Sequence, residues 1–336
     1  MCTHPEHQHS ADRASNGVSR RAVMMGALAA GGLAVAAAFT QAGAAPARAA
    51  TAATGDRIVP LGLDGGPRIN NVPAPIASAK PSLALVVNGQ TYLVDAGLDS
   101  ARQLARAGLP FSALHNVFVT HHHFDHTSGL DGLVLHGWTT TNPLSDVQFW
   151  GPPSMNRQLQ GIRTTFAEEL ALFESGGGFP PFPTVTAHEV PIAPGAHIAR
   201  VMEDENVVVD ATHVFHGPEV RTAYAYRFTI KSTGKVVVFS GDTAAPDDNL
   251  IALAQGADVL VHEVQDNDNV EKIVSTIPNA QQAAQLRGTA PTPMGTSRST
   301  WCSGSTAPAI CTASSTGGHT TTAAADPSAR AGSTTP

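Results

Sequence analysis

The chain has 336 residues, in which 20 Lys and Arg stand against 27 Asp and Glu, a formal net charge of −7. Hydrophobic residues make up 42%, which at this length indicates a globular protein with a full core and excludes a wholly disordered chain. The acidic balance offers no Lys/Arg cluster that would attract a duplex or an anionic membrane surface. We therefore expect no nucleic-acid partner and no stable membrane insertion.

The first 49 residues predict an export signal. Arg20 and Arg21 form a twin arginine, residues 24–38 contain only Ala, Gly, Leu, Val and Met, and Ala47-Arg48-Ala49 fits a cleavage site. The apolar run is short for a membrane span. The segment resembles a twin-arginine signal, so we expect the twin-arginine export machinery to carry the chain to the periplasm or the extracellular space. An uncleaved anchor is the alternative.

From residue 57 onward, short apolar runs separated by Gly, Pro and Asn predict strands and turns. Asn88-Gly89 between two such runs predicts a tight hairpin. Strands are expected over 58–62, 82–87, 90–95, 116–120, 147–150, 207–211, 223–230, 236–240 and 259–262, and helices over 100–107, 155–175 and 247–254. Strands that alternate with helices in two successive blocks favour an α/β sandwich with the sheets inside.

The last stretch, residues 288–336, lacks Leu, Val, Phe and Tyr and is dominated by Ser, Thr, Ala, Gly and Pro. Such a segment cannot bury enough apolar surface to offset its ordering entropy, so we expect it to be disordered. Two interpretations stay open: a low-complexity tail, or a reading frame that shifts near residue 288. The expected organisation is a signal over 1–49, a folded domain over 50–287 and the tail over 288–336.

A histidine-rich motif directly follows the expected buried strand at 116–120. His121 and His123 are two residues apart, so in extended chain their side chains point the same way and can converge on one ion. Asp125 and His126 follow and can turn back toward a second ion. Neutral imidazoles and carboxylates suit zinc or a similar divalent metal. A surface polyhistidine patch would need no buried strand before it.

This H-x-H-x-D-H motif resembles that of the metallo-β-lactamase superfamily. Two later regions, 214–218 with 226–227 and 238–243 with 262–263, are similar to the ribonuclease Z and arylsulfatase-like branch. Together the matches cover roughly residues 57–265 in the family's order. The resemblance implies an αββα sandwich, a metal-dependent hydrolase, and zinc as the cofactor in one or two ions, with manganese or iron as alternatives.

The resemblance also implies the ligand set. His121, His123 and His216 would hold one ion. Asp125 and His126 would hold the other, and the carboxylate of Asp242 would bridge both. A carboxylate between two cations offsets their repulsion, and a water bound there loses its proton near neutral pH. The hydroxide so formed is the expected nucleophile.

Four further roles are expected at this site. Asp125 is also assigned to catalysis, as the acceptor of the water's proton. His262 is assigned to proton handling, with a plain buried histidine as the alternative. His213 competes with His216 for the third ligand position, since the two lie three residues apart at a strand end. Asp95 is expected to orient a ligand imidazole from behind, or to be a turn residue.

One histidine of the family pattern is missing. The family places its last metal ligand on a strand well beyond the His-Glu motif, whereas the only histidine after His262 is His319, which no apolar strand precedes. We therefore expect a weak or absent second ion, and we expect the C-terminal strand and helix of the sandwich to be missing. An exposed sheet edge would follow.

The substrate expected from the sequence is small. Ribonuclease Z enzymes carry a long tRNA-gripping arm, but residues 227–236 leave room only for a hairpin turn. The leading hypothesis is an exported hydrolase of a small ester, such as an aryl sulfate, a phosphodiester or a lactone. The alternatives are a truncated, catalytically impaired metal-binding remnant and a ribonuclease Z-type endoribonuclease. A homodimer is left open.

Overall fold

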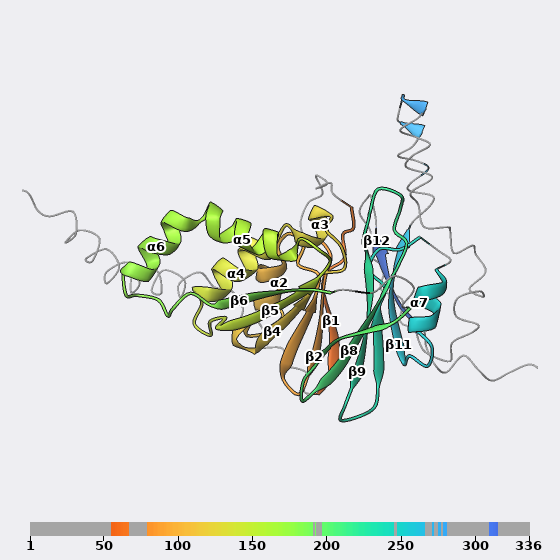
Figure 1. Cartoon of the computed structure of the whole chain (residues 1–336), viewed down its shortest axis with the longest axis horizontal. Coiled ribbons are helices and arrows are strands. Elements are labelled where there is room, and N and C mark those ends of the chain that lie inside the picture. The colour runs from red at the N-terminus through yellow and green to blue at the C-terminus, as the bar shows by residue number, and fades with distance from the viewer. Residues whose placement is uncertain are drawn as a thin grey trace, which may run out of the picture. The chain divides into compact units, whose positions relative to one another are not determined.

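The computed structural model describes residues 55–66, 79–190, 192, 197–244, 247–265, 271, 275, 276, 278–280 and 309–314. Two six-stranded sheets form the body of this part of the chain (Figure 1). Within it, no helix has both the length and the apolar character that crossing a membrane requires. The expected export signal lies outside the described residues, so it remains a prediction.

The first sheet has the strand order β1-β2-β3-β4-β5-β6. Its first three strands pair antiparallel, and β3 to β6 pair parallel. Asn88 and Gly89 both have positive φ in the turn between β2 and β3, which confirms the expected hairpin. The strands are β1 Arg57–Gly62, β2 Ser82–Val87, β3 Gln90–Val94, β4 Leu114–Phe118, β5 Asp146–Gly151 and β6 Thr184–Glu189.

The second sheet has the order β12-β11-β10-β9-β8-β7. Strands β7 to β10 pair antiparallel, whereas β10, β11 and β12 pair parallel. The strands are β7 Ala199–Glu203, β8 Val207–His213, β9 Tyr224–Ile230, β10 Val236–Phe239, β11 Val259–Gln265 and β12 Ala309–Ser314.

Helices α2, α4 and α5 lie on the outer face of the first sheet and α7 lies on that of the second, whereas α3 lies at the strand ends (Figure 1). Helix α2 contacts β1, α5 contacts β5 and β6, and α7 contacts β8 and β9 of the second sheet. The helical elements are α2 Ser100–Arg106, η1 Phe111–Ala113, α3 Phe124–Thr127, α4 Leu130–Trp138, α5 Met155–Thr165, α6 Ala167–Ser175 and α7 Asp248–Leu253.

Successive side chains of a strand point to opposite faces of its sheet, and here both faces are apolar. One face of each sheet therefore packs against the other sheet, and the opposite face packs against helices. In β2, Ala84 and Val86 pack under the outer helices, while Leu85 and Val87 pack between the sheets. The second sheet repeats the pattern, with Val238 on the α7 side. The expected α/β sandwich is therefore confirmed.

The C-terminal edge differs from the sequence expectation. The last strand was expected to be missing, yet β12 pairs with β11 in parallel from Leu260↔Ala309 to Gln265↔Ser314. This strand carries none of the long apolar runs that mark most of the other strands, so composition does not reveal it, and backbone pairing with β11 places it. The expected domain boundaries fall largely outside the described residues and remain predictions.

Candidate metal centre

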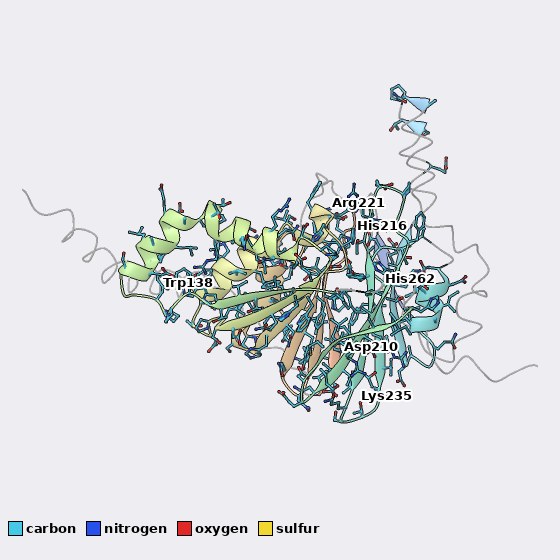
Figure 2. All side chains as sticks on the ribbon, in the orientation of Figure 1. Trp138, Asp210, His216, Arg221, Lys235 and His262 are labelled. Atoms are coloured by element: carbon cyan, nitrogen blue, oxygen red, sulfur yellow. The ribbon has the colours of Figure 1, made fainter. Side chains whose placement is uncertain are left out.

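The site lies where several strands of both sheets end. His121 and His123 follow β4, His216 follows β8, and Asp242 follows β10. In the side-chain view, His216 lies at the end of the second sheet that is opposite to Lys235 (Figure 2). Segments far apart in sequence meet here because parallel and antiparallel pairing brings these strand ends to one edge of the sandwich.

Two groups of side chains in the described part of the chain could hold a metal ion, and both contain the same histidine. The ligand atoms within each group lie within 4.8 Å of one another. The shared residue is His121, whose ring centroid lies 4.6 Å from that of His123, 4.7 Å from that of His216 and 4.2 Å from that of His126. The groups are His121, His123 and His216, and His121, His126 and Asp242.

The ligand nitrogens of this cluster fit a cation. Nε2 of His121 is buried without a hydrogen-bond partner, and Nε2 of His126 is buried beside the carboxylates of Asp242 and Asp125. Buried polar atoms are nearly always paired, and leaving one unpaired costs about 1–3 kcal/mol, so the unpaired nitrogen of His121 needs an explanation. A divalent ion satisfies that nitrogen, because neutral imidazole nitrogen and carboxylate oxygen are the usual ligands of such an ion.

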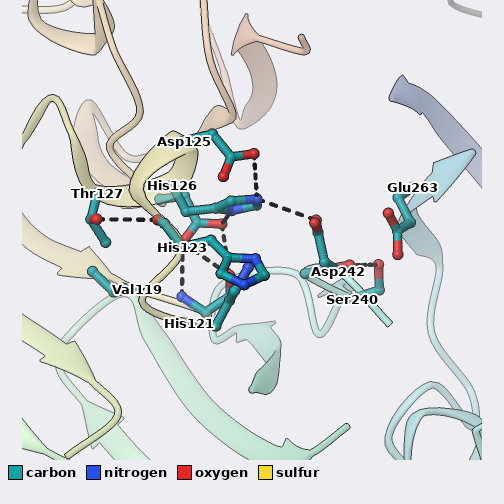
Figure 3. A network of polar contacts seen from close by, with 12 residues as sticks. Val119, His121, His123, Asp125, His126, Thr127, Ser240, Asp242 and Glu263 are labelled. Carbon is teal, nitrogen blue, oxygen red and sulfur yellow. Dashed lines mark hydrogen bonds and ion pairs between the residues drawn. The ribbon is translucent and has the colours of Figure 1, made fainter. Parts of the chain in front are cut away.

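Asp242 faces histidines of both groups (Figure 3). Its Oδ1 lies 3.3 Å from His126 Nε2, and its Oδ2 lies 3.8 Å from His216 Nε2. Burial acts to raise the pKa of Asp242, but the charge and hydrogen bond of His126 outweigh it and hold that pKa well below its usual range. The carboxylate is therefore ionised and placed between the two groups.

Asp125 lies beside the group of His121, His126 and Asp242 but is not a member of it. Its Oδ2 is 3.6 Å from His126 Nε2, and the carboxyl is buried (Figure 3). Gly97 makes this arrangement feasible, because a Cβ at that position would lie 2.2 Å from the carbonyl oxygen of Asp125. The chain after β3 thus passes directly under the metal-binding motif.

Asp95 organises the motif from behind. Its Oδ2 lies 2.8 Å from His126 Nδ1, and its Oδ1 accepts a hydrogen bond of 2.8 Å from the backbone N–H of Thr120. With Nδ1 engaged in this way, Nε2 of His126 faces the cluster. Asp95 has a φ of 60°, a left-handed conformation that few residues other than Gly adopt. The geometry agrees with both roles expected for Asp95, because it is a turn residue that also holds the imidazole of the candidate ligand His126.

The surroundings shift the pKa values of His121 and His126 in opposite directions. Burial lowers the pKa of His121, and the neighbouring His126 lowers it further. Burial would also lower the pKa of His126, but Asp242 and Asp95 raise it well above its usual value. The site therefore keeps His121 neutral beside a position that favours positive charge, which is the electrostatic setting that a cation would meet.

The structure separates the other histidines from the cluster. His122 Nε2 lies 2.8 Å from the carbonyl oxygen of Pro153, so His122 points elsewhere, as expected. The ring of His213 lies 4.9 Å from that of Tyr224. The structure thus brings His216, and not His213, to His121. His319 lies outside the described residues.

His262 is buried on β11 but belongs to neither group. Burial lowers its pKa to about 4, against the opposing effect of Asp242. Its expected role in proton handling stays a prediction.

Sequence reasoning gave no role to two carboxyl groups that support the site. Glu263 Oε1 accepts a hydrogen bond of 2.6 Å from the backbone N–H of Thr243, the residue after Asp242. Burial raises the pKa of Glu263 well above its usual value, and Asp242 raises it further. The second is Asp247, whose Oδ2 accepts a hydrogen bond of 2.8 Å from the backbone N–H of Phe215.

Comparison with known proteins identifies the family. The model of the beta-lactamase superfamily domain matches residues 90–293. The chain therefore belongs to the beta-lactamase superfamily, has the metallo-β-lactamase fold, and is a hydrolase of that superfamily. The histidine and carboxylate groups described above could hold the metal that such hydrolases use.

The similar proteins indicate which branch of the superfamily the chain resembles. The chain is 29% identical over 199 residues to the Ribonuclease Z of Mycobacterium bovis (strain BCG / Pasteur 1173P2). This alignment covers 58% of this chain and 67% of that protein. It is 28% identical over 251 residues to the Ribonuclease Z of Gemmatimonas aurantiaca, covering 61% and 74%. The structure of human tRNase Z, short form, aligns with a TM-score of 0.50 and 23% identity over 69% of this chain and 88% of that one, which shows the fold. The resemblance to the ribonuclease Z branch is thus confirmed.

These relatives correct one expectation. A small ester and no nucleic-acid partner were expected from the sequence, whereas the relatives are named for the hydrolysis of RNA. The expectation of no nucleic-acid partner is therefore wrong. It failed because net charge averages over the whole chain and does not report the chemistry of one local site.

Proposed function

We propose that this protein is a metal-dependent phosphodiesterase that hydrolyses RNA. The observation that carries the proposal is the cluster of His121, His123, His126, His216 and Asp242, in which the buried Nε2 of His121 has no hydrogen-bond partner. The names of the relatives, Ribonuclease Z and tRNase Z, favour RNA over an aryl sulfate or a lactone as the ester.

We propose zinc as the metal. His121, His123 and His216 would hold one ion, and His126 with Asp242 would hold a second beside Asp125. When bound, a divalent metal supplies Lewis-acid polarisation of a phosphoryl oxygen and lowers the pKa of a coordinated water. Imidazole nitrogens form most of the donor set, which suits zinc better than the oxygen-preferring magnesium or calcium.

The chain's own side chains have distinct tasks in this proposal. Asp95 fixes the ring of His126, and Asp242 supplies negative charge between the histidine groups. The buried carboxylate of Asp125 lies beside His126 and is placed to accept the proton of the attacking water. Burial of Asp95, Asp125 and His126 strengthens the electrostatic contacts that they make.

The RNA would meet a short surface rather than a long arm. Strands β9 and β10 are joined by a tight turn, in which the backbone N–H of Gly234 donates to the carbonyl oxygen of Ile230 at 2.8 Å. The hairpin expected from residues 227–236 is therefore present. Contacts to an RNA strand must come from the surface around the metal centre itself.

The second candidate is a catalytically impaired metal-binding protein. The observation that favours it is the sharing of His121 by both groups, because in the described part of the chain the two groups cannot each have a full set of ligands of their own. This candidate predicts metal uptake without turnover.

RNA cleavage by matched histidine variants tests the proposal. A 5′-labelled RNA hairpin with a single-stranded 3′ extension is incubated with wild type, His121→Ala and His122→Ala, and the products are sized. Wild type and His122→Ala should cleave equally, because His122 points away from the cluster. His121→Ala should lose more than about 100-fold in rate, since it removes a ligand common to both groups.

The opposite results separate the candidates. No cleavage by wild type that carries stoichiometric metal would favour the impaired metal-binding protein. Equal cleavage by wild type and His121→Ala would place the activity elsewhere or in a contaminant.

A further inference from the structure

Two exposed phenylalanines border the metal centre. Phe124 is 62% exposed and Phe215 is 59% exposed, whereas Phe118 and Phe228 are completely buried between the sheets. Phe124 lies between His123 and Asp125 in the sequence, and Phe215 directly precedes His216. Each ring therefore presents an aromatic face to solvent beside a polar cluster, and nucleobases stack on side chains of this kind.

These rings stand on fixed backbone. The backbone N–H of Phe215 donates to Asp247 Oδ2 at 2.8 Å, and its carbonyl accepts from Ala244 at 2.7 Å. The carbonyl of Phe124 accepts a hydrogen bond of 2.7 Å from Ser128 in the short helix α3. Neither ring belongs to any of the three buried clusters of the fold. Their exposure is thus held in place and does not arise from a free chain end.

Each phenylalanine is next in sequence to a histidine of the cluster, and these two histidine side chains are in contact. Nδ1 of His123 lies 3.2 Å from Nε2 of His216, so the backbone positions that carry Phe124 and Phe215 flank one point of the cluster from two different sheets. The groups next to a phosphate bound at the cluster would therefore lie near the segments that carry these residues.

We propose that Phe124 and Phe215 form a stacking surface for the nucleobases next to the phosphodiester that is cleaved. This inference rests on the proposed function and names the part of the RNA that the site recognises. Aromatic side chains bind single strands by stacking on the bases, an interaction that amounts to about 5- to 150-fold in affinity for each base. Stacking needs no basic patch, which accords with a net charge of −7.

Two activated diesters that share a leaving group isolate the contribution of the base. Uridine 5′-(4-nitrophenyl phosphate) carries a base, and methyl 4-nitrophenyl phosphate carries none. In both, a water oxygen bonds to phosphorus, the bond to 4-nitrophenolate breaks, and the water's proton passes to Asp125 and from there to solvent. The ratio of the two kcat/KM values therefore reports the contact with uridine and cancels effects on the metal or on the leaving group.

The variants are Phe124→Ala, Phe215→Ala and the conservative Phe124→Tyr and Phe215→Tyr. Leu172→Ala is the matched control, because Leu172 on α6 is 68% exposed and lies outside the site. Each alanine variant should lower the uridine-to-methyl ratio about tenfold, the tyrosine variants should keep it within about twofold, and Leu172→Ala should leave it unchanged. Metal content and size on gel filtration are measured for each variant.

Three results would overturn the inference. Equal losses on both diesters would mean that the phenylalanines support the metal cluster rather than the base. A wild-type dimer that the alanine variants dissolve would mean that the rings contact a second copy of the chain. An unchanged ratio in both alanine variants would remove any role in base recognition. If wild type hydrolyses neither diester, the proposed function fails, and this inference fails with it.

Discussion

Asp247 joins the loop of His216 to the helix that follows Asp242. One oxygen of its buried carboxylate accepts a hydrogen bond of 2.9 Å from the backbone N–H of Leu250 at the start of α7, and the other accepts one of 2.8 Å from Phe215. The carbonyl of Phe215 in turn accepts from Ala244, two residues after Asp242. The segments that carry two of the cluster residues are thereby locked together.

Asp247→Asn should therefore loosen the metal centre and lower stability. The amide keeps one acceptor oxygen for α7 but turns an N–H₂ group toward the N–H of Phe215, which costs about 1–3 kcal/mol in the free energy of unfolding. Urea denaturation measures this loss, and zinc competition with a chromophoric chelator measures the expected fall in affinity. Asp248→Ala, at the exposed neighbour, is the control and should change stability by less than about 1 kcal/mol. Equal effects of both variants would contradict the account.

Asp95→Asn should weaken metal binding without unfolding the protein. The carboxylate holds His126 Nδ1 at 2.8 Å and the N–H of Thr120 at 2.8 Å, and an amide can satisfy only one of these partners. Outer carboxylates that orient ligand histidines typically contribute about 10- to 100-fold to metal affinity. The dissociation constant for zinc should rise by that factor. An unchanged zinc affinity would show that His126 needs no support from behind.

Gly97→Ala should disrupt the site through sterics alone. A Cβ at this position would lie 2.2 Å from the carbonyl oxygen of Asp125 and 2.6 Å from the Cβ of Lys80, so the backbone must shift at a cost of at least about 2 kcal/mol. Gly161→Ala in α5 is the matched control, since a Cβ there meets nothing within 4 Å. Because alanine favours helix over glycine, that control should gain about 0.5–1 kcal/mol. Thermal unfolding of both variants checks the opposite signs.

The export signal remains a proposal with a direct test. Replacing Arg20 and Arg21 by Lys keeps the charge but removes the twin arginine on which the proposed twin-arginine route depends. Cell fractionation should find the wild-type chain outside the cytoplasm and the double variant inside it. Efficient export of the double variant would rule out the twin-arginine route.

Local patterns predicted most of the sheets, and tertiary contacts explain what they missed. Strands with alternating or continuous apolar residues were placed to within about two residues, the usual spread of element boundaries, except that β11 continues to Gln265. Helix α4 was missed because Gly132 and Gly137 lower its helix propensity. A Cβ at Gly137 would lie 2.8 Å from the ring of Phe111, so packing requires the glycine that propensity disfavours. Strands β6 and β7 were missed because they are edge strands with half-exposed residues.

The candidate site also has a part that the local sequence predicts and a part that depends on tertiary contacts. The motif from His121 to His126 could be predicted because all its residues lie within one short segment after a strand. The supporting role of Asp247 could not, because its contact with Phe215 spans 32 residues and depends on how two loops pack. The expected helix over 155–175 is in fact two helices, separated at Phe166, whose backbone leaves the helical region with φ −106° and ψ 21°.

Metal removal and restoration test the central claim most directly. The purified chain is treated with a chelator, its metal content is measured, and zinc is added back in steps while hydrolysis of methyl 4-nitrophenyl phosphate is followed. The account predicts that activity disappears with the metal and returns in proportion to bound zinc, up to saturation at about one or two ions per chain. Full activity in the metal-free protein would contradict the account.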